Sequence, residues 1–168
     1  MLVAGMVSLC LPVAAKEATE TSREAERIAE LDAYWSTVAR AVKEGDFELY
    51  RSTCHPEAVY VNGIRKQSYP LTKALARWKK EFDDTRDGSR TSGLELRFSQ
   101  RLGDATTAHE TGMFLYTATL PDGKKIHEFI HLEALLVRVD GDWKVFMEYQ
   151  KSVGTEAEWK ALAPGPTP

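Results

Sequence analysis

The amino-acid sequence predicts an α+β protein in which N-terminal helices pack on one face of a curved antiparallel sheet. Two observations predict this class. The apolar residues repeat about every 3.6 positions before Gly93 and about every 2 after it, and turn signals divide the second half into long strands. Helices that precede a run of strands are typical of α+β architecture. The 168 residues suit one domain, and no internal repeat is visible.

The first half of the chain predicts three helices and one short strand. Apolar residues at steps of three and four predict a helix over 22–44, which Gly45 ends. A short helix over 46–51, capped by its first residue, precedes a short strand over 58–61. A third helix is predicted over 71–82. The apolar faces of the two longer helices are formed by Ile28, Leu31, Trp35, Val38 and Val42, and by Leu71, Leu75, Trp78 and Phe82.

The second half predicts a meander of four long strands and a short terminal helix. The first strand begins at Leu94, and the tight turns are Pro121-Asp122-Gly123 and Asp140-Gly141-Asp142. The remaining strands are predicted over 105–120, 125–139 and 143–151, and the helix over 156–162, before a Pro-rich tail.

Composition excludes several classes of protein. The net charge of −3 gives no basic footprint for nucleic acid, and no apolar run reaches the length that spans a bilayer. We therefore expect neither a nucleic-acid nor a membrane partner.

The first fifteen residues carry no charge, and they resemble the apolar part of a signal peptide that ends at Val13-Ala14-Ala15. The positive residues that normally precede such a segment are missing, so a buried helical turn is the alternative. Export predicts a secreted or periplasmic protein divided into a signal peptide (1–15), a linker (16–23), a domain (24–152), and a short helix with tail (153–168). Cleavage after Ala15 would remove Cys10 and leave Cys54 without a disulfide partner in the chain. Cys54 is then a small apolar residue, or a reactive thiol beside His55.

The segment His127-Glu128-Phe129-Ile130-His131 matches the HExxH motif of zinc proteases. That motif binds zinc on a helix, where both histidines reach one ion. The flanking turns favour a strand, on which the two histidines stand about 13 Å apart. A zinc protease is therefore the least favoured function, and we predict no metal and no organic cofactor.

Three-residue hairpin loops set the register of the predicted strands. They place Met113 opposite His131, Thr111 opposite Glu133, and Glu133 opposite Tyr149. This register predicts an apolar set that faces the helices, made of Phe129, Leu135, Val137, Val139, Trp143, Val145, Met147 and Tyr149.

Polar residues interrupt the middle of this predicted inner face, where an unpaired ionisable group is costly. His131 and Glu133 lie about 7 Å apart along one strand, which is close enough for acid–base chemistry. Burial would raise the pKa of Glu133, and a protonated His131 would lower it. A satisfied buried network is the alternative to a pocket. The candidate catalytic residues are Glu133, His131, His109 and Tyr149, and the candidate ligand-binding residues are Trp35, Tyr60, Trp78, Thr111, Met113, His127, Phe129 and Met147.

The chain resembles the nuclear transport factor 2-like superfamily, in particular its SnoaL-like branch and ketosteroid isomerase. The likeness covers about residues 24–152 and rests on the segments EGDFELY, HPEAVYVNG, LGDATTAHETG and VRVDGDWKVF. It implies a cone-shaped, cystatin-like fold with a pocket between helices and sheet, and catalysis by side chains alone, as in ketosteroid isomerase. It also implies a homodimer through the outer sheet face, for which Leu132, Leu136 and Phe146 are the candidate contacts.

Two functions fit these predictions. One is an exported isomerase, lyase or hydrolase that acts on an apolar ring-bearing molecule, with Glu133 or His131 as base and Tyr149 as hydrogen-bond donor. The other is a non-catalytic module that binds an apolar small molecule or a peptide.

Overall fold

The computed structural model describes residues 13–166, and it describes side chains from residue 20 onward. The helices of the first half are α1 (Val13–Glu44), α2 (Phe47–Ser52) and α3 (Leu71–Arg86). They confirm the three predicted helices. The predicted N-terminal bound at residue 22 is wrong, because α1 begins at Val13 and includes the predicted linker. Its first turns are rich in Ala, Glu and Lys, which favour helix without an apolar stripe. Residues 1–12 of the predicted signal peptide lie outside the described residues.

Six strands form one sheet with the order β2-β1-β6-β5-β4-β3. All neighbours are antiparallel except β1 and β6, which are parallel. The sequence predicted every strand but β2, whose four residues end in a proline at the sheet edge. The strands are β1 (Cys54–Asn62), β2 (Gln67–Pro70), β3 (Thr91–Gly103), β4 (Thr107–Thr119), β5 (Lys125–Val139) and β6 (Asp142–Val153).

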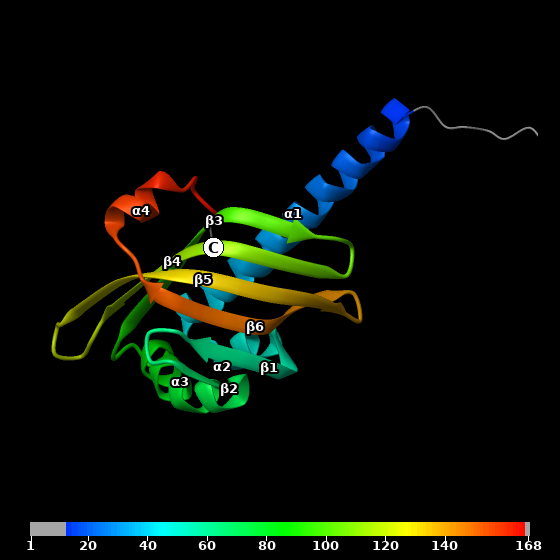
Figure 1. Ribbon diagram of the computed structural model, residues 1–168. Coiled ribbons are helices and arrows are strands. Elements are labelled where there is room, and N and C mark those ends of the chain that lie inside the picture. The colour runs from blue at the N-terminus through cyan, green and yellow to red at the C-terminus, as the bar shows by residue number, and fades with distance from the viewer. Residues whose placement is uncertain (1–12, 167–168) are drawn as a thin grey trace, which may run out of the picture.

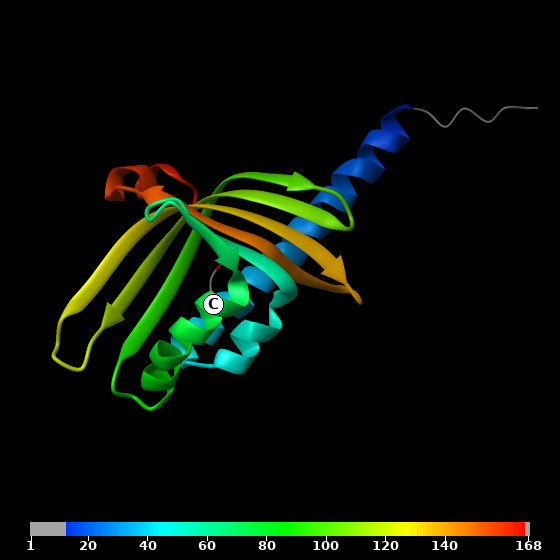
Figure 2. The ribbon, with the colours of Figure 1, turned by 60° about the horizontal axis from the view of Figure 1, so that its bottom comes forward.

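The sheet is curved and unclosed, and its two faces carry different elements (Figures 1 and 2). Helices α1, α2 and α3 lie on the concave side. The short helix α4 (Glu156–Ala161) lies on the convex side. The predicted apolar faces of α1 and α3 are confirmed at Leu31, Trp35, Val38, Leu71 and Leu75, which join the concave core.

The ends of the first two helices follow the local sequence. Gly45, with a φ of +70°, ends α1 in a conformation that a side chain would strain. Asp46 caps α2 by accepting a hydrogen bond of 2.9 Å from the backbone N–H of Leu49, as predicted. No helix among the described residues combines the length and apolarity needed to cross a membrane.

The predicted pairing of β4 with β5 is confirmed, but the predicted three-residue loop between β5 and β6 is wrong, because Val139 pairs with Asp142 and leaves a turn of two residues, Asp140 and Gly141. Met113 lies opposite His131, Thr111 opposite Glu133, and Glu133 opposite Tyr149. The predicted direction of the side chains is wrong for most of this sheet. A β-bulge is the reason: Leu135 pairs with Met147 but Leu136 pairs with Val145, which leaves Phe146 as an extra residue in β6.

One extra residue moves the following side chains to the opposite face of the strand. Trp143 and Val145 face the helices as predicted, but they do so beside Leu132, Ala134 and Leu136. The set Phe129, Leu135, Val137, Val139, Met147 and Tyr149 therefore belongs to the alternate positions, which point away from that core.

The predicted dimer contacts are corrected by the same finding. Leu132 and Leu136 are 3% and 0% exposed and lie in the concave core, so they cannot meet a partner. Phe146 packs against the His55 ring, with 4.9 Å between ring centroids.

Candidate functional site

A cavity of about 710 Å³ lies between the concave face of the sheet and the helices. Its volume falls in the range of small-molecule sites. Most of its wall is aromatic or aliphatic. Tyr60 and Trp78 meet edge to face with 5.3 Å between ring centroids, and Tyr50 meets Trp78 at 6.2 Å. The other apolar side chains in the wall include Tyr34, Trp35, Val38, Phe82, Leu94, Leu96, Phe114, Tyr116, Ile130, Leu132 and Val145.

Glu148 of β6 places a carboxyl group in this apolar wall. Burial raises the pKa of Glu148, and hydrogen bonds from Gln150 and Tyr50 oppose that rise. Gln150 Nε2 donates to Glu148 Oε1 at 2.8 Å. Tyr60 Oη donates to Gln150 Oε1 at 2.8 Å, and Asn62 Nδ2 donates to Tyr60 Oη at 3.0 Å. The carboxyl is therefore held at a fixed place by neighbouring strands β1 and β6.

Three tyrosine hydroxyls and one thiol lie near Glu148. Burial raises the pKa of Tyr34 and of Tyr50 well above the ordinary value for tyrosine, and it raises the pKa of Tyr60 and of Cys54 to about 12. All four groups stay protonated at neutral pH and can act as hydrogen-bond donors. The Cys54 thiol is thus a poor nucleophile, which supports its interpretation as a small apolar residue.

A cluster of polar side chains lies between α3 and strands β3 and β4, and its members Glu81, Thr85, Ser92 and Tyr116 line the cavity. Arg90, whose side chain is 9% exposed, forms an ion pair of 3.0 Å with Glu81 and donates a hydrogen bond to the Tyr116 hydroxyl. Tyr116 in turn donates to Glu81 at 3.2 Å. Thr85 and Ser92 share a hydrogen bond of 2.9 Å beside them. These groups satisfy one another and fix α3 against the sheet.

The structure places three predicted ligand-binding residues, Trp35, Tyr60 and Trp78, in the wall of this cavity. His127 and Phe129 of β5 lie at its edge, but their rings turn to the convex side, where Phe129 contacts Trp159 of α4.

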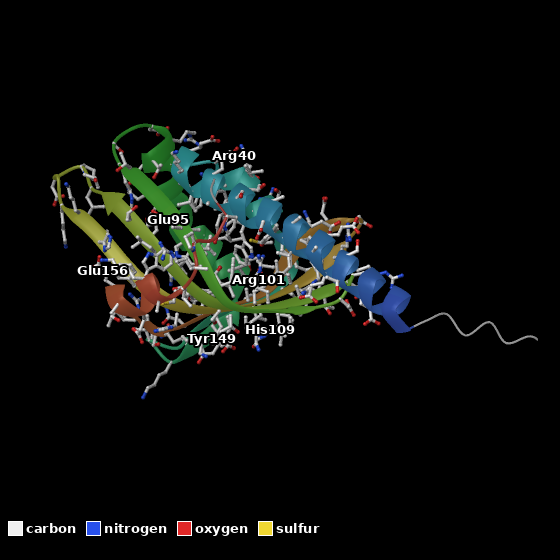
Figure 3. All side chains as sticks on the ribbon, turned by 90° about the horizontal axis from the view of Figure 1, so that it is seen from above. Arg40, Glu95, Arg101, His109, Tyr149 and Glu156 are labelled. Atoms are coloured by element: carbon white, nitrogen blue, oxygen red, sulfur yellow. The ribbon has the colours of Figure 1, made fainter. Side chains whose placement is uncertain are left out.

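The other predicted site residues do not line the cavity. Figure 3 shows His109 and Tyr149 on the side of the sheet away from α1. Glu133 contacts Lys151 and His109 there, and the hydrogen bond from Lys151 is the main cause of its lowered pKa. The residues on this convex side are Glu133, His131, His109, Tyr149, Thr111, Met113 and Met147.

The expectation that Glu133 and His131 face the helices is therefore wrong. A base at Glu133 would act on solvent rather than on a molecule in the cavity. The bulge at Phe146 explains the error, because it reverses the inner and outer positions of β6 beyond Val145.

The polar cavity residues that sequence reasoning missed include Glu148, Gln150, Tyr50, Asn62, Arg65 and Arg77. One signal could have found Glu148. The run Val145-Phe146-Met147 places three apolar residues in succession, and such a break in the alternation of a strand indicates a bulge.

The HExxH segment lies on β5, as predicted, and its residues point alternately to the two faces. His127 and His131 share the convex face: His127 packs against Phe129 beside α4, and His131 lies beside Gly154 and 3.5 Å from Glu158. Within residues 20–166, no cluster of His, Cys, Asp and Glu has the arrangement of a metal site.

Comparison with solved structures identifies the fold. No family model matches the chain, and no curated protein gives a significant match. A conserved protein from Planctomyces limnophilus is 13% identical with a TM-score of 0.65, over 76% of this chain and 95% of its own. An NTF-2-like protein of unknown function from Shewanella oneidensis is 13% identical with a TM-score of 0.56, over 72% and 95%. A protein from Catenulispora acidiphila, solved in complex with S-DNPA, is 20% identical with a TM-score of 0.58, over 82% and 98%.

Proposed function

Because the chain has the nuclear transport factor 2-like fold, we propose that its concave cavity binds a small, mostly apolar, ring-bearing molecule and that Glu148 acts on it as an acid–base group. The reaction classes that such a group serves are isomerisation, elimination and hydrolysis. The single observation that carries the proposal is a carboxyl of raised pKa in an aromatic cavity.

The cavity supports the binding step. Its volume accommodates a molecule of one to three rings, and its aromatic side chains offer edges and faces for stacking. The complex of the Catenulispora acidiphila protein with S-DNPA supports the view that this fold can accept a small molecule.

The surroundings of Glu148 support the chemical step. A raised pKa makes the carboxylate a stronger base than an exposed glutamate, and an apolar wall excludes competing water. The Tyr60 proton is engaged by Gln150, but the protonated Tyr50 hydroxyl, which hydrogen-bonds Glu148, can turn to an oxygen or nitrogen of the ligand that gains negative charge. Glu148 would thus remove a proton while Tyr50 stabilises the resulting anion.

The test uses 5-nitrobenzisoxazole, an apolar bicyclic probe. A carboxylate base removes the proton from C3, the N–O bond breaks, and a coloured cyanophenolate forms. We expect the wild-type protein and Glu133→Gln to convert the probe at equal rates, and Glu148→Gln to lose at least about 100-fold. The rate should rise with pH through the raised pKa of Glu148, because only the carboxylate accepts the proton.

Equal rates for wild type and Glu148→Gln would contradict the proposal, and so would a loss confined to Glu133→Gln. Binding of the probe without turnover would favour the alternative, a non-catalytic binding module. Isothermal titration at the same pH separates these results, because it measures binding whether or not the probe reacts.

Export and dimerisation remain proposals. The uncharged first residues support export, and Leu135 and Met147 on the convex face of the sheet are apolar positions that a second copy could cover. Native mass spectrometry of the secreted protein tests both, and a full-length monomer would contradict both.

A further inference from the structure

Two arginines contribute to the wall of the cavity where it meets solvent. Arg65 follows β1 in the turn toward β2, and Arg77 lies on α3. Both side chains are exposed although they line the cavity, and their neighbour Ile64 is 48% exposed. Among residues 20–166, neither arginine forms an ion pair with a carboxylate. An unpaired guanidinium at the mouth of an apolar site is positioned to meet an anionic ligand group.

Both arginines contact residues of the cavity wall near Glu148. The backbone N–H of Arg65 donates to Asn62 Oδ1 at 2.8 Å, and Asn62 donates to Tyr60. Arg77 Nη1 donates to the Tyr69 hydroxyl at 2.9 Å, and the guanidinium lies 6.0 Å from the centre of the Trp78 ring. The Arg77 guanidinium therefore has a defined place on the aromatic wall that leads to the carboxyl, and the backbone of Arg65 is fixed at the rim of that wall.

The acidic groups around the mouth limit the charge of the ligand. Glu81 is neutralised by its ion pair of 3.0 Å with Arg90. Glu128 also lines the cavity and is exposed, so it offsets one of the two free arginines. The two exposed arginines outnumber this one exposed carboxylate, which favours a monoanion over a doubly charged phosphate.

We propose that the ligand of this cavity is a ring compound that carries one carboxylate, and that Arg65 and Arg77 bind that carboxylate at the mouth while the rings occupy the aromatic interior. The inference rests on the proposed function, since it names the ligand class of the same site. Arg65 and Arg77 are then specificity-determining residues, and Glu148 is the group that meets the opposite end of the ligand.

Isothermal titration with two matched probes tests this assignment. Naphthalene-2-carboxylate and naphthalene-2-carboxamide have the same rings and shape but differ in charge. In low-salt buffer at pH 7.5, we expect the wild-type protein to bind the carboxylate about ten-fold more tightly than the carboxamide. Arg65→Gln and Arg77→Gln should each weaken carboxylate binding about three-fold and leave carboxamide binding unchanged. The preference for the carboxylate should shrink as salt is raised.

Arg40→Gln is the matched control, because Arg40 is an exposed arginine of α1 outside the cavity wall (Figure 3). It should leave the affinity for both probes unchanged. Equal wild-type affinity for both probes, or an equal effect of Arg40→Gln, would overturn the carboxylate assignment while leaving the cavity as a binding site. Failure of both probes to bind would overturn the proposed function and this assignment together. Thermal melts of the variants verify that each substitution leaves the fold intact.

Discussion

Two glutamates on neighbouring strands have opposite environments. Glu148 faces the helices, and burial raises its pKa. Glu133 faces the other side, where the Lys151 ammonium and His109 lower its pKa. The difference in pKa follows from the face of the sheet to which each strand directs its glutamate side chain. A carboxyl with a raised pKa is a better candidate for proton transfer than one held as a paired carboxylate.

This contrast predicts opposite effects of pH on the stability of two variants. The folded pKa of Glu148 lies above its unfolded value, so its favourable contribution is complete below the unfolded pKa and is lost as pH rises through the folded pKa. The free energy of unfolding of Glu148→Gln should therefore increase relative to wild type between pH 4 and pH 8. Urea denaturation across this range measures the difference.

Glu133→Gln should show the reverse trend. The folded pKa of Glu133 is lowered, so its contribution is present above the unfolded pKa and is lost as pH falls through the folded pKa. The variant should lose stability relative to wild type as pH rises from 3 toward 6. The same trend in both variants would contradict the assignment of the two residues to opposite environments.

At the scale of elements, the sequence was sufficient for the helices and for the pairing of β4 with β5, but not for the two-residue turn between β5 and β6. The stripe through Leu31, Trp35 and Val38 predicts the buried face of α1, and that face is buried. Turn chemistry at Pro121-Asp122-Gly123 predicts the register of β4 and β5. Both are local patterns, which is why they can be predicted from neighbouring residues.

The bulge in β6 could not be placed by the same reasoning. Phe146 is an extra residue relative to β5, and its position depends on packing against His55, which is about 90 residues earlier in the chain. An alternating pattern without a bulge fits the first residues of β6 equally well. The candidate site was therefore predicted on the wrong face, although the fold and most of the strand pairs were correct.

Helix α4 is a second element whose existence was predicted but whose packing was not. Trp159 is 4% exposed and packs with Met113 and Leu115 on the convex face. The Arg97 guanidinium lies 4.5 Å from the centre of the Trp159 ring, and Arg97 donates hydrogen bonds to the carbonyl groups of Trp159 and Leu162. This helix therefore covers part of the face that a second copy would otherwise contact.

We predict that Trp159→Ala lowers the free energy of unfolding by about 3 kcal/mol, because it removes a large buried side chain and leaves a cavity. Lys160→Ala, at an exposed position of the same helix, should change it by less than about 0.5 kcal/mol. Urea denaturation of both variants is the measurement. A small effect of Trp159→Ala would mean that α4 is not docked on the sheet.

At the scale of the whole molecule, the curvature of the sheet separates two environments. The concave side holds the helices, and the convex side holds α4 (Figure 2). The cavity on the concave side buries the Glu148 carboxyl in an aromatic wall, and the convex side carries ion pairs such as Lys151 with Glu133. The change in apolar period along the chain is enough to predict this architecture. It is not enough to predict the site, because one inserted residue decides which side chains of β6 enter the cavity.

Glu148, and not Glu133, is the carboxyl group that burial in the cavity holds at a raised pKa. A ¹³C NMR titration of the glutamate carboxyls, assigned with Glu148→Gln and Glu133→Gln, tests it most directly. Glu148 should titrate above the ordinary range for glutamate and Glu133 below it. Addition of naphthalene-2-carboxamide should shift the Glu148 resonance alone. A lowered pKa for Glu148, or a ligand response at Glu133 instead, would contradict the account.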